Sequence, residues 1–290
     1  MNQNPVDRWL VRKAFDQAAP GYEQHAVLQR EIESRLLERL PLLELDPDRV
    51  LDLGCGTGRG SAALKQQFPG AQVIALDFAP AMLFQARQQS RSRRPLLLCA
   101  DLTRIPVAAS TIDLIFANLS LQWCNDPDPV FNEFRRVLRP GGALLFSTFG
   151  PDTLTELRQA WAAVDGCSHV NDFIDMHHLG DSLVAAGFQQ PVMDAELITL
   201  TYSGVSQLLS ELKGLGAHNL TRRRNHALTG RQRLQAMIDA YEKFRDGDRY
   251  PATWEVVYGM ARAPAEGQPI RTADGETATF SIDHLRRGAR

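Results

Sequence analysis

The sequence predicts an α/β protein with a doubly wound, mostly parallel sheet of seven strands. Three observations lead to this fold class. Short apolar, β-rich runs alternate with helical stretches between residues 49 and 149. The stretch VLDLGCGTGRG places Gly54, Gly56 and Gly58 between a strand and a helix, as in a nucleotide-binding corner. The sequence RPGG at 139–142 ends a helix before the next strand.

Composition and charge narrow the class of protein before any motif is considered. The chain has 290 residues, 44% hydrophobic and 23% charged, as is typical of a soluble globular protein. Its net charge of −2 gives no global basic field for nucleic acid. No apolar run approaches the ~20 residues that span a bilayer, and MNQNPVDRWLVRKAFDQ is too polar for a signal peptide. We therefore expect a cytoplasmic protein that binds neither nucleic acid nor a membrane.

Cysteine and histidine positions suggest neither a metal site nor a disulfide framework. The segment MHHLGD lacks the ligand spacing of a metal site, so no metal is expected. The cysteines lie far apart and form no CxxC pair, which favours buried or idle thiols. They are Cys55, Cys99, Cys124 and Cys167.

Residues 1–48 are predicted to form a helical cover. Its helices run over 7–18 and about 22–40, with AAPGY as the break between them. Apolar residues recur at helical spacing in the second helix, which gives it a face to bury. These residues are Leu28, Ile32, Leu36, Leu37 and Leu40.

The predicted core occupies residues 49–202. Its first five strands are expected at 49–53, 72–77, 96–100, 112–118 and 142–149. The helices between them are expected at about 60–68, 80–89 and 129–138. Two more helices, near 153–164 and 179–186, precede PVMDAELITLTY, which alternates like an edge strand.

The remaining chain is predicted to add a helical insertion at 203–250, a lid for the substrate or carrier. The last core strand is expected within 251–263, where WEVVYGMAR has strand character. The polar tail, residues 264–290, is expected to be loose.

The glycine corner favours a cationic nucleoside over a dinucleotide. A dinucleotide fingerprint has the spacing G-x-G-x-x-G, but here the last position falls on Arg59 and the spacing is G-x-G-x-G. Asp52, two residues before the first glycine, would repel phosphate and suit an ammonium or a sulfonium. Asp77, at the end of the second strand, can accept hydrogen bonds from both ribose hydroxyls. Asp101, beside the apolar Leu102, can accept from an exocyclic amine.

Together the motifs resemble the class I S-adenosylmethionine-dependent methyltransferases. They are VLDLGCGTG, VIALDFAPAML, ADLTRIPV, IDLIFANLSLQW and RVLRPGG, in the family's order. The resemblance implies S-adenosyl-L-methionine as cofactor and S-adenosyl-L-homocysteine as product. Asp77 would bind the ribose, Met82 would flank the adenine, Asp101 with Leu102 would bind its edge, and Asn118 would close the pocket. The residues implied at the methionine end are Asp52, Gly54, Gly56 and Gly58.

A second resemblance covers nearly the whole chain except the tail. It rests on FDQAAPGYEQHAVLQRE, ANLSLQWCNDP, FGPDTLTELRQAW, HVNDF, LKGLGAHNL, LTGRQRL and YPATWEVVYG. These segments are similar to the malonyl-acyl-carrier-protein O-methyltransferases of biotin synthesis, which esterify the free carboxylate of a malonyl thioester so that it can prime pimeloyl synthesis. The alternatives are another small-molecule or quinone methyltransferase, or a methyltransferase-like respiratory complex assembly factor with similar DTLTELR and PAT segments.

The implied reaction requires no general base, because a carboxylate with a pKa near 4 is already ionised at pH 7. A dry pocket that strips water from the carboxylate would help. Tyr22, Gln122 and Trp123 are the candidate catalytic residues, since each can donate a hydrogen bond to it. The alternatives are a packing role for Trp123 and a solvated loop position for Gln122.

The insertion carries basic residues and, between residues 212 and 238, no acid. We interpret them as a docking patch for an acidic acyl carrier protein and its phosphopantetheine phosphate. A solvated face is the alternative, and a nucleic-acid patch is disfavoured by the acidic balance and the lack of interleaved aromatics. The candidate residues are Lys213, His218, Arg222, Arg223, Arg224 and Arg231.

Overall fold

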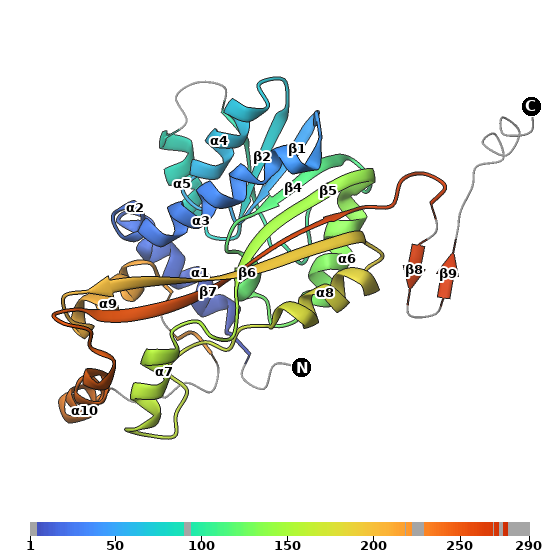
Figure 1. The fold of residues 1–290 in the computed structure, drawn as a ribbon. Coiled ribbons are helices and arrows are strands. Elements are labelled where there is room, and N and C mark those ends of the chain that lie inside the picture. The colour runs from blue at the N-terminus through green and yellow to red at the C-terminus, as the bar shows by residue number, and fades with distance from the viewer. Residues whose placement is uncertain are drawn as a thin grey trace, which may run out of the picture.

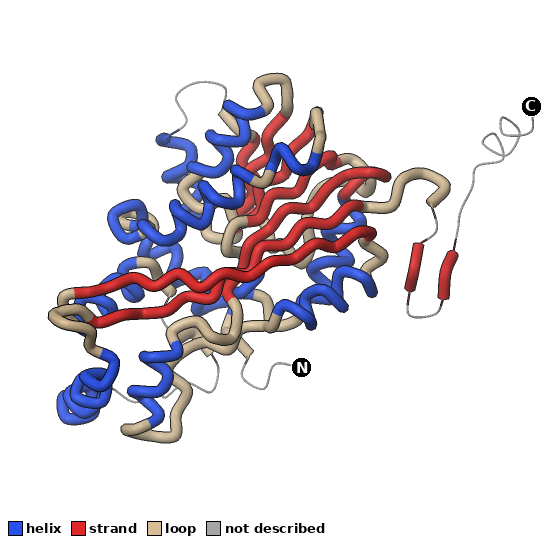
Figure 2. The backbone as a smooth tube through the Cα atoms, in the orientation of Figure 1, coloured by secondary structure: helices blue, strands red, loops and turns tan. Residues whose placement is uncertain are grey.

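The computed structural model describes residues 5–89, 94–217, 219–221, 229–268, 270–272 and 275–277. In this part of the chain, seven strands form one twisted sheet with helices on both faces (Figures 1 and 2). The strand order is β3-β2-β1-β4-β5-β7-β6. The predicted α/β class and its seven-stranded, mostly parallel sheet are confirmed.

Five strands run parallel, and two antiparallel strands complete the sheet. The parallel strands are β1 (Arg49–Leu53), β2 (Gln72–Asp77), β3 (Leu96–Cys99), β4 (Ile112–Ala117) and β5 (Leu138–Phe149). The antiparallel strands are β7 (Tyr250–Arg262), which pairs with β5, and the edge strand β6 (Gln189–Tyr202), which pairs with β7. The alternating segment PVMDAELITLTY therefore lies at an edge, as predicted.

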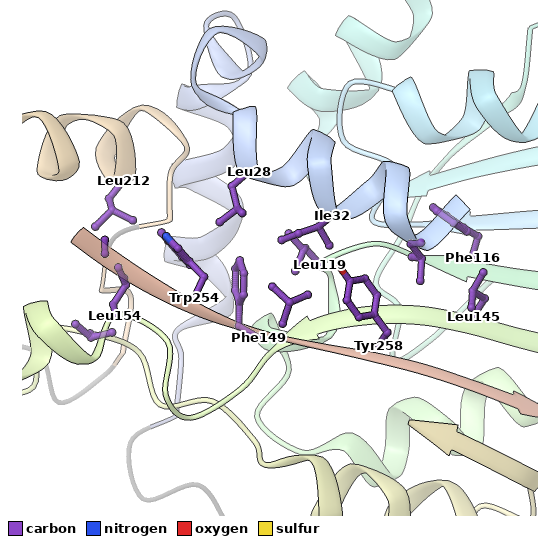
Figure 3. Packing of buried hydrophobic residues seen from close by; sticks show 14 of the residues in the cluster. Leu28, Ile32, Phe116, Leu119, Leu145, Phe149, Leu154, Leu212, Trp254 and Tyr258 are labelled. Carbon is purple, nitrogen blue, oxygen red and sulfur yellow. The ribbon is translucent and has the colours of Figure 1, made fainter. Parts of the chain in front are cut away.

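The apolar faces of the helices bury the two sides of the sheet. The helices are α4 (Arg59–Gln67), α5 (Pro80–Gln89), α6 (Pro127–Val137), α7 (Thr155–Ala162) and α8 (Met176–Ala185) in the core, and α3 (Val27–Glu38) in the N-terminal cover. On one face, Leu28 and Ile32 of α3 pack with Phe149, Trp254 and Tyr258 of the strands (Figure 3). The second apolar cluster packs side chains of α6 and α8 against the sheet.

Two predicted boundaries were wrong. The helix expected over 22–40 is broken at Ala26, whose ψ of 40° is not helical, into α2 (Tyr22–His25) and α3, and a 3-10 turn follows at Leu40–Leu43. RPGG ends α6 as expected, but it lies within β5, which begins at Leu138. Gly141 has a φ of +76°, and the β4–β5 register shifts between the pairs Ile112–Leu138 and Leu114–Ala143. The glycines accommodate an irregularity within the strand.

The N-terminal helices and the insertion meet. The first helix is α1 (Arg8–Ala18), and the insertion contains α9 (Val205–Gly214) and α10 (Arg231–Tyr241). Val6 forms an isolated antiparallel bridge with Thr221, and the Asp7 amide donates to the Leu220 carbonyl at 2.8 Å. α1, α2 and α9 lie together beyond the carboxyl ends of the parallel strands, where β6 and β7 extend past the rest of the sheet (Figure 1).

Other expectations concern cysteines, metals, membranes and the tail. All four cysteines are free; Cys55 is buried, whereas Cys99 and Cys167 are exposed. The described residues contain no cluster of three or more potential metal ligands. None of the helices described is long and apolar enough to cross a bilayer. Within the described part of the tail, β8 (Ile270–Thr272) and β9 (Gly275–Thr277) pair as antiparallel strands.

Candidate functional site

One cavity of about 130 Å³ lies where the parallel strands end. Its floor includes the glycine corner after β1 and the acids that follow β2 and β3. Its walls come from α1, α2 and α3, and Leu215 and Ala217 of the insertion complete the lining. All three parts of the chain therefore contribute to one site at the carboxyl ends of the strands, where open α/β sheets bind ligands.

The three glycines of the corner adopt backbone conformations that suit glycine. Gly54, Gly56 and Gly58 have φ angles of +70°, +52° and +86°. A Cβ at position 54 would lie 2.5 Å from the Cβ of Ser120, and one at position 58 would lie 2.8 Å from the Cβ of Ala86. At position 56 a Cβ would meet nothing within 4 Å. Gly54 and Gly58 thus permit close packing of the loop, and Gly56 leaves its backbone open to a ligand.

Asp77 holds the glycine corner against the end of β2. One carboxylate oxygen accepts from the Gly56 amide at 2.9 Å and the other from the Ala79 amide at 2.8 Å. Burial raises its pKa to about 6, while these two hydrogen bonds lower it. Sequence reasoning proposed a ribose contact for Asp77, and the structure adds this second role in positioning the loop.

Asp52 is a buried carboxylate without an adjacent cation among the described residues. Its side chain accepts a hydrogen bond from the Ser61 hydroxyl at 2.5 Å. Burial raises its pKa to about 7, and the negative charges of Glu33 and Asp77 raise it as well. A positively charged ligand would therefore relieve an electrostatic cost at this position.

Asp101 forms an ion pair with the N-terminal cover. One oxygen accepts from the amide and hydroxyl of Thr103, at 2.8 and 2.6 Å, and the other forms an ion pair with Arg8 of α1. Arg8 also donates to the Thr103 hydroxyl at 3.1 Å. Leu102 and Met82 line the same cavity, and Met82 is buried. The predicted adenine-binding residues thus line one part of the cavity, and the ion pair of Arg8 with Asp101 joins α1 to it.

Asn118 and Gln122 follow β4 and are held by protein contacts. Asn118 donates to the Gln29 carbonyl at 3.3 Å and accepts from the Ser147 hydroxyl at 2.7 Å. Gln122 donates to the Leu119 carbonyl at 2.6 Å. Both residues line the cavity. Since the Gln122 amide has two N–H groups, one of them is not used by this bond.

Tyr22 and Trp123 line the cavity together with Phe15 of α1. The Trp123 ring packs edge-on against Phe15, with centroids 5.2 Å apart, and Phe15 also contacts Tyr22 at 6.4 Å. Burial raises the pKa of Tyr22, so its hydroxyl stays protonated and can donate a hydrogen bond. The three candidate catalytic residues are brought together here; their roles stay predictions.

The basic residues of the insertion are separate from the cavity where they are described. Lys213 is exposed on α9 and Arg231 is exposed at the start of α10, and neither lines the cavity. His218, Arg222, Arg223 and Arg224 lie outside the described residues.

Sequence reasoning missed a set of charged and polar residues on the cavity wall. Glu23 accepts a hydrogen bond from the Thr57 hydroxyl of the glycine corner, and Arg30 donates to the Glu23 carbonyl at 2.5 Å. Gln29 and Glu33 also face the cavity. Positions 29, 30 and 33 share one face of α3, but nothing in the local sequence assigns that face to a cavity.

The residues present fit the implied cofactor, S-adenosylmethionine. A sulfonium and an ammonium would compensate buried carboxylates, and ribose hydroxyls can donate to Asp77. The side-chain oxygens of Gln29 and Ser120 are buried, find no hydrogen-bond partner among the described residues, and belong to residues that line the cavity. Such orphaned polar atoms are expected where a polar ligand supplies the missing partners.

Comparisons with known proteins first identify the general class of protein. A family model described as a methyltransferase domain matches residues 51–146. The structure resembles a putative methyltransferase from Bacillus halodurans C-125, with a TM-score of 0.57, 18% identity, and coverage of 80% of this chain and 100% of that one. It also resembles the [4+2]-cyclase SpnF, with a TM-score of 0.53, 22% identity, and coverage of 81% and 80%. The chain therefore contains a methyltransferase domain with the class I methyltransferase fold.

Relatives along the full chain narrow the class. A malonyl-[acyl-carrier protein] O-methyltransferase of Laribacter hongkongensis is 50% identical over 278 residues, 93% of both chains. One from Xylella fastidiosa is 47% identical over 282 residues, 96% of both chains. The chain belongs to the malonyl-[acyl-carrier protein] O-methyltransferase family, as the motifs predicted.

Proposed function

We propose that this enzyme transfers a methyl group from S-adenosylmethionine to the free carboxylate of a malonyl thioester on acyl carrier protein. The methyl ester would then prime synthesis of the pimeloyl precursor of biotin. The observation that carries this proposal is the extent of the family likeness, which includes the helical cover and the insertion as well as the methyltransferase domain. Both segments contribute residues to the lining of the cavity.

The proposed cofactor would lie along the glycine corner. When bound, S-adenosylmethionine supplies an electrophilic methyl group on a cationic sulfur. Asp52 and the corner backbone would hold its methionine end, Asp77 the ribose, and Met82 and Asp101 the adenine. The convergence of these residues on one cavity supports this assignment.

The chain's own contribution to the reaction would be orientation and exclusion of water. The substrate carboxylate needs no proton removed at pH 7. Tyr22 and Trp123 would donate hydrogen bonds to it and fix its direction, and Phe15 and Phe149 would keep the surroundings apolar. A carboxylate that loses water and is held in contact with an opposite charge reacts faster.

A methyl-transfer assay tests the proposed substrate. Malonyl-acyl carrier protein, malonyl-coenzyme A and free malonate are compared as acceptors, with methyl ester formation followed by mass spectrometry. We expect the highest kcat/KM with the carrier-bound substrate. Binding of S-adenosylhomocysteine without transfer to any malonyl acceptor would retain the methyltransferase class and reject the substrate.

The carrier interaction has its own test, which uses the basic insertion. Reversal of Arg222, Arg223 and Arg224 to glutamate should lower kcat/KM for malonyl-carrier protein more than for malonyl-coenzyme A. The difference should narrow as salt rises, because electrostatic steering is screened. Equal losses on both substrates, independent of salt, would instead assign these residues to folding or to the pocket.

A further inference from the structure

The glycine corner leaves one part of the proposed ligand unassigned. Its acids suit the ammonium or sulfonium of S-adenosylmethionine, but the methionine end also carries a carboxylate. That carboxylate would enter a cavity already lined by Glu23, Glu33, Asp52, Asp77 and Asp101. A matching cation is therefore needed close to the methionine end.

Among the described residues, three arginines line the cavity, and two of them have carboxylate partners at hydrogen-bond distance. Arg8 is paired with Asp101, and Arg59 with Glu33 at 2.8 Å. Arg30 donates one hydrogen bond to the Glu23 carbonyl, and its distance to the Glu23 carboxylate is 3.7 Å. A guanidinium has five N–H donors, so most of those of Arg30 are not used by the contacts found among the described residues.

Acceptors for an ammonium lie one turn along the same helix. A Cβ at position 60 would lie 3.1 Å from Glu33 Oε2 and 3.5 Å from Asp52 Oδ2, so two carboxylate oxygens approach the same point. Glu33 uses its other oxygen for Arg59, and its side chain is only 12% exposed. Gln29 adds a buried Oε1 that has no hydrogen-bond partner in the described part of the chain.

We propose that α3 recognises the amino-acid head of the cofactor, with Arg30 binding its carboxylate and Gln29 and Glu33 binding its ammonium. The proposal deepens the function above and rests on it. Positions 29, 30 and 33 lie on one helix face, so a single element presents opposite charges to a dipolar group. Arginine suits this role because its planar donors match a carboxylate in pairs. The cover would therefore help to select the ligand as well as enclose it.

The test compares two ligands that differ by one carboxylate. Calorimetry measures the affinity of S-adenosylhomocysteine and of its decarboxylated analogue, which keeps the amine. We expect wild-type protein to bind S-adenosylhomocysteine at least about tenfold more tightly, and Arg30→Gln to remove this difference by weakening that ligand alone. Arg30→Lys should recover part of the difference, and Glu33→Gln should weaken both ligands.

Arg35→Gln is the matched control. Arg35 lies on the same helix but pairs with Glu31 and Glu196, at 2.8 and 2.7 Å, outside the cavity. Its loss should leave both affinities unchanged. Equal weakening of both ligands by Arg30→Gln would overturn the proposal and make Arg30 a structural part of the cover. If wild-type protein bound neither ligand, the proposed cofactor itself would be rejected, and this inference with it.

Discussion

Substitution of Asp52 by asparagine should stabilise the unliganded protein while it weakens ligand binding. The side chain is 2% exposed, and its pKa of about 7 compares with an ordinary value of 3.8. The folded chain therefore holds this proton more tightly than the unfolded chain. The contribution of the protonated Asp52 to the free energy of unfolding is therefore fully present below pH 3.8. It is lost as the pH rises through 7.

The size of the effect follows from the two pKa values. Once Asp52 is fully ionised, at pH 8, its burial costs about 4 kcal/mol relative to the neutral form. Between pH 5 and pH 8 the free energy of unfolding of the wild-type protein should fall by ~3 kcal/mol through this group. The asparagine variant has no such group and should not show this decrease. The amide oxygen of asparagine can still accept the Ser61 hydrogen bond, so that contact need not be lost.

Urea unfolding at pH 5 and pH 8 measures this difference. Asp113 provides the control, because it is also buried but accepts from the amides of Asp48 and Arg49, at 2.8 and 2.7 Å, and pairs with Arg139. Asp113→Asn should destabilise at both pH values, by about 2 kcal/mol or more. An Asp52→Asn effect that does not change with pH would show that Asp52 carries no uncompensated charge.

The other predictions concern the glycine corner and the pocket. Asp77→Ala should weaken binding of S-adenosylhomocysteine at least about tenfold by calorimetry, since charged acceptors contribute ~1.5–3 kcal/mol each; unchanged affinity would reject the ribose assignment. Tyr22→Phe and Trp123→Ala should lower turnover more than cofactor affinity, with no histidine-dependent limb in the pH–rate profile between pH 6 and 8; turnover that follows a histidine titration would contradict the base-free mechanism. Gly58→Ala should cost ~1–3 kcal/mol in urea unfolding, because its Cβ would clash with Ala86 and its φ is +86°; a neutral result would mean that α5 yields easily.

The sequence was most informative where the interactions are local. The bounds of β1, β2 and α5 match the expected ranges, because apolar runs and flanking turns determine them. The acids of the site were also predictable, because parallel strands bring Asp52, Asp77 and Asp101 to one edge of a sheet. Topology places these residues together without any knowledge of side-chain packing.

The missed features depend on packing between distant segments. The break at Ala26 carries no glycine or proline, so nothing in the local sequence marks it. Glu23 and Arg30 belong to the site only because α2 and α3 lie across the glycine corner, where Glu23 meets Thr57. Helical periodicity predicted that α3 has a buried face, but not that polar residues beside it would face a ligand cavity.

The meeting of Val6 with Thr221 bears on the order in which the chain can fold during synthesis. The first helix leaves the ribosome early, but its partners at Leu220 and Thr221 are made some 200 residues later. Until then its apolar residues, such as Val11 and Phe15, have only part of their final packing. Contacts so distant in sequence form slowly because a long loop must close first. α1 can already contact the core through the contacts of Arg8 with Asp101 and of Asp16 with Ala81, but its packing is complete only after the insertion has been made.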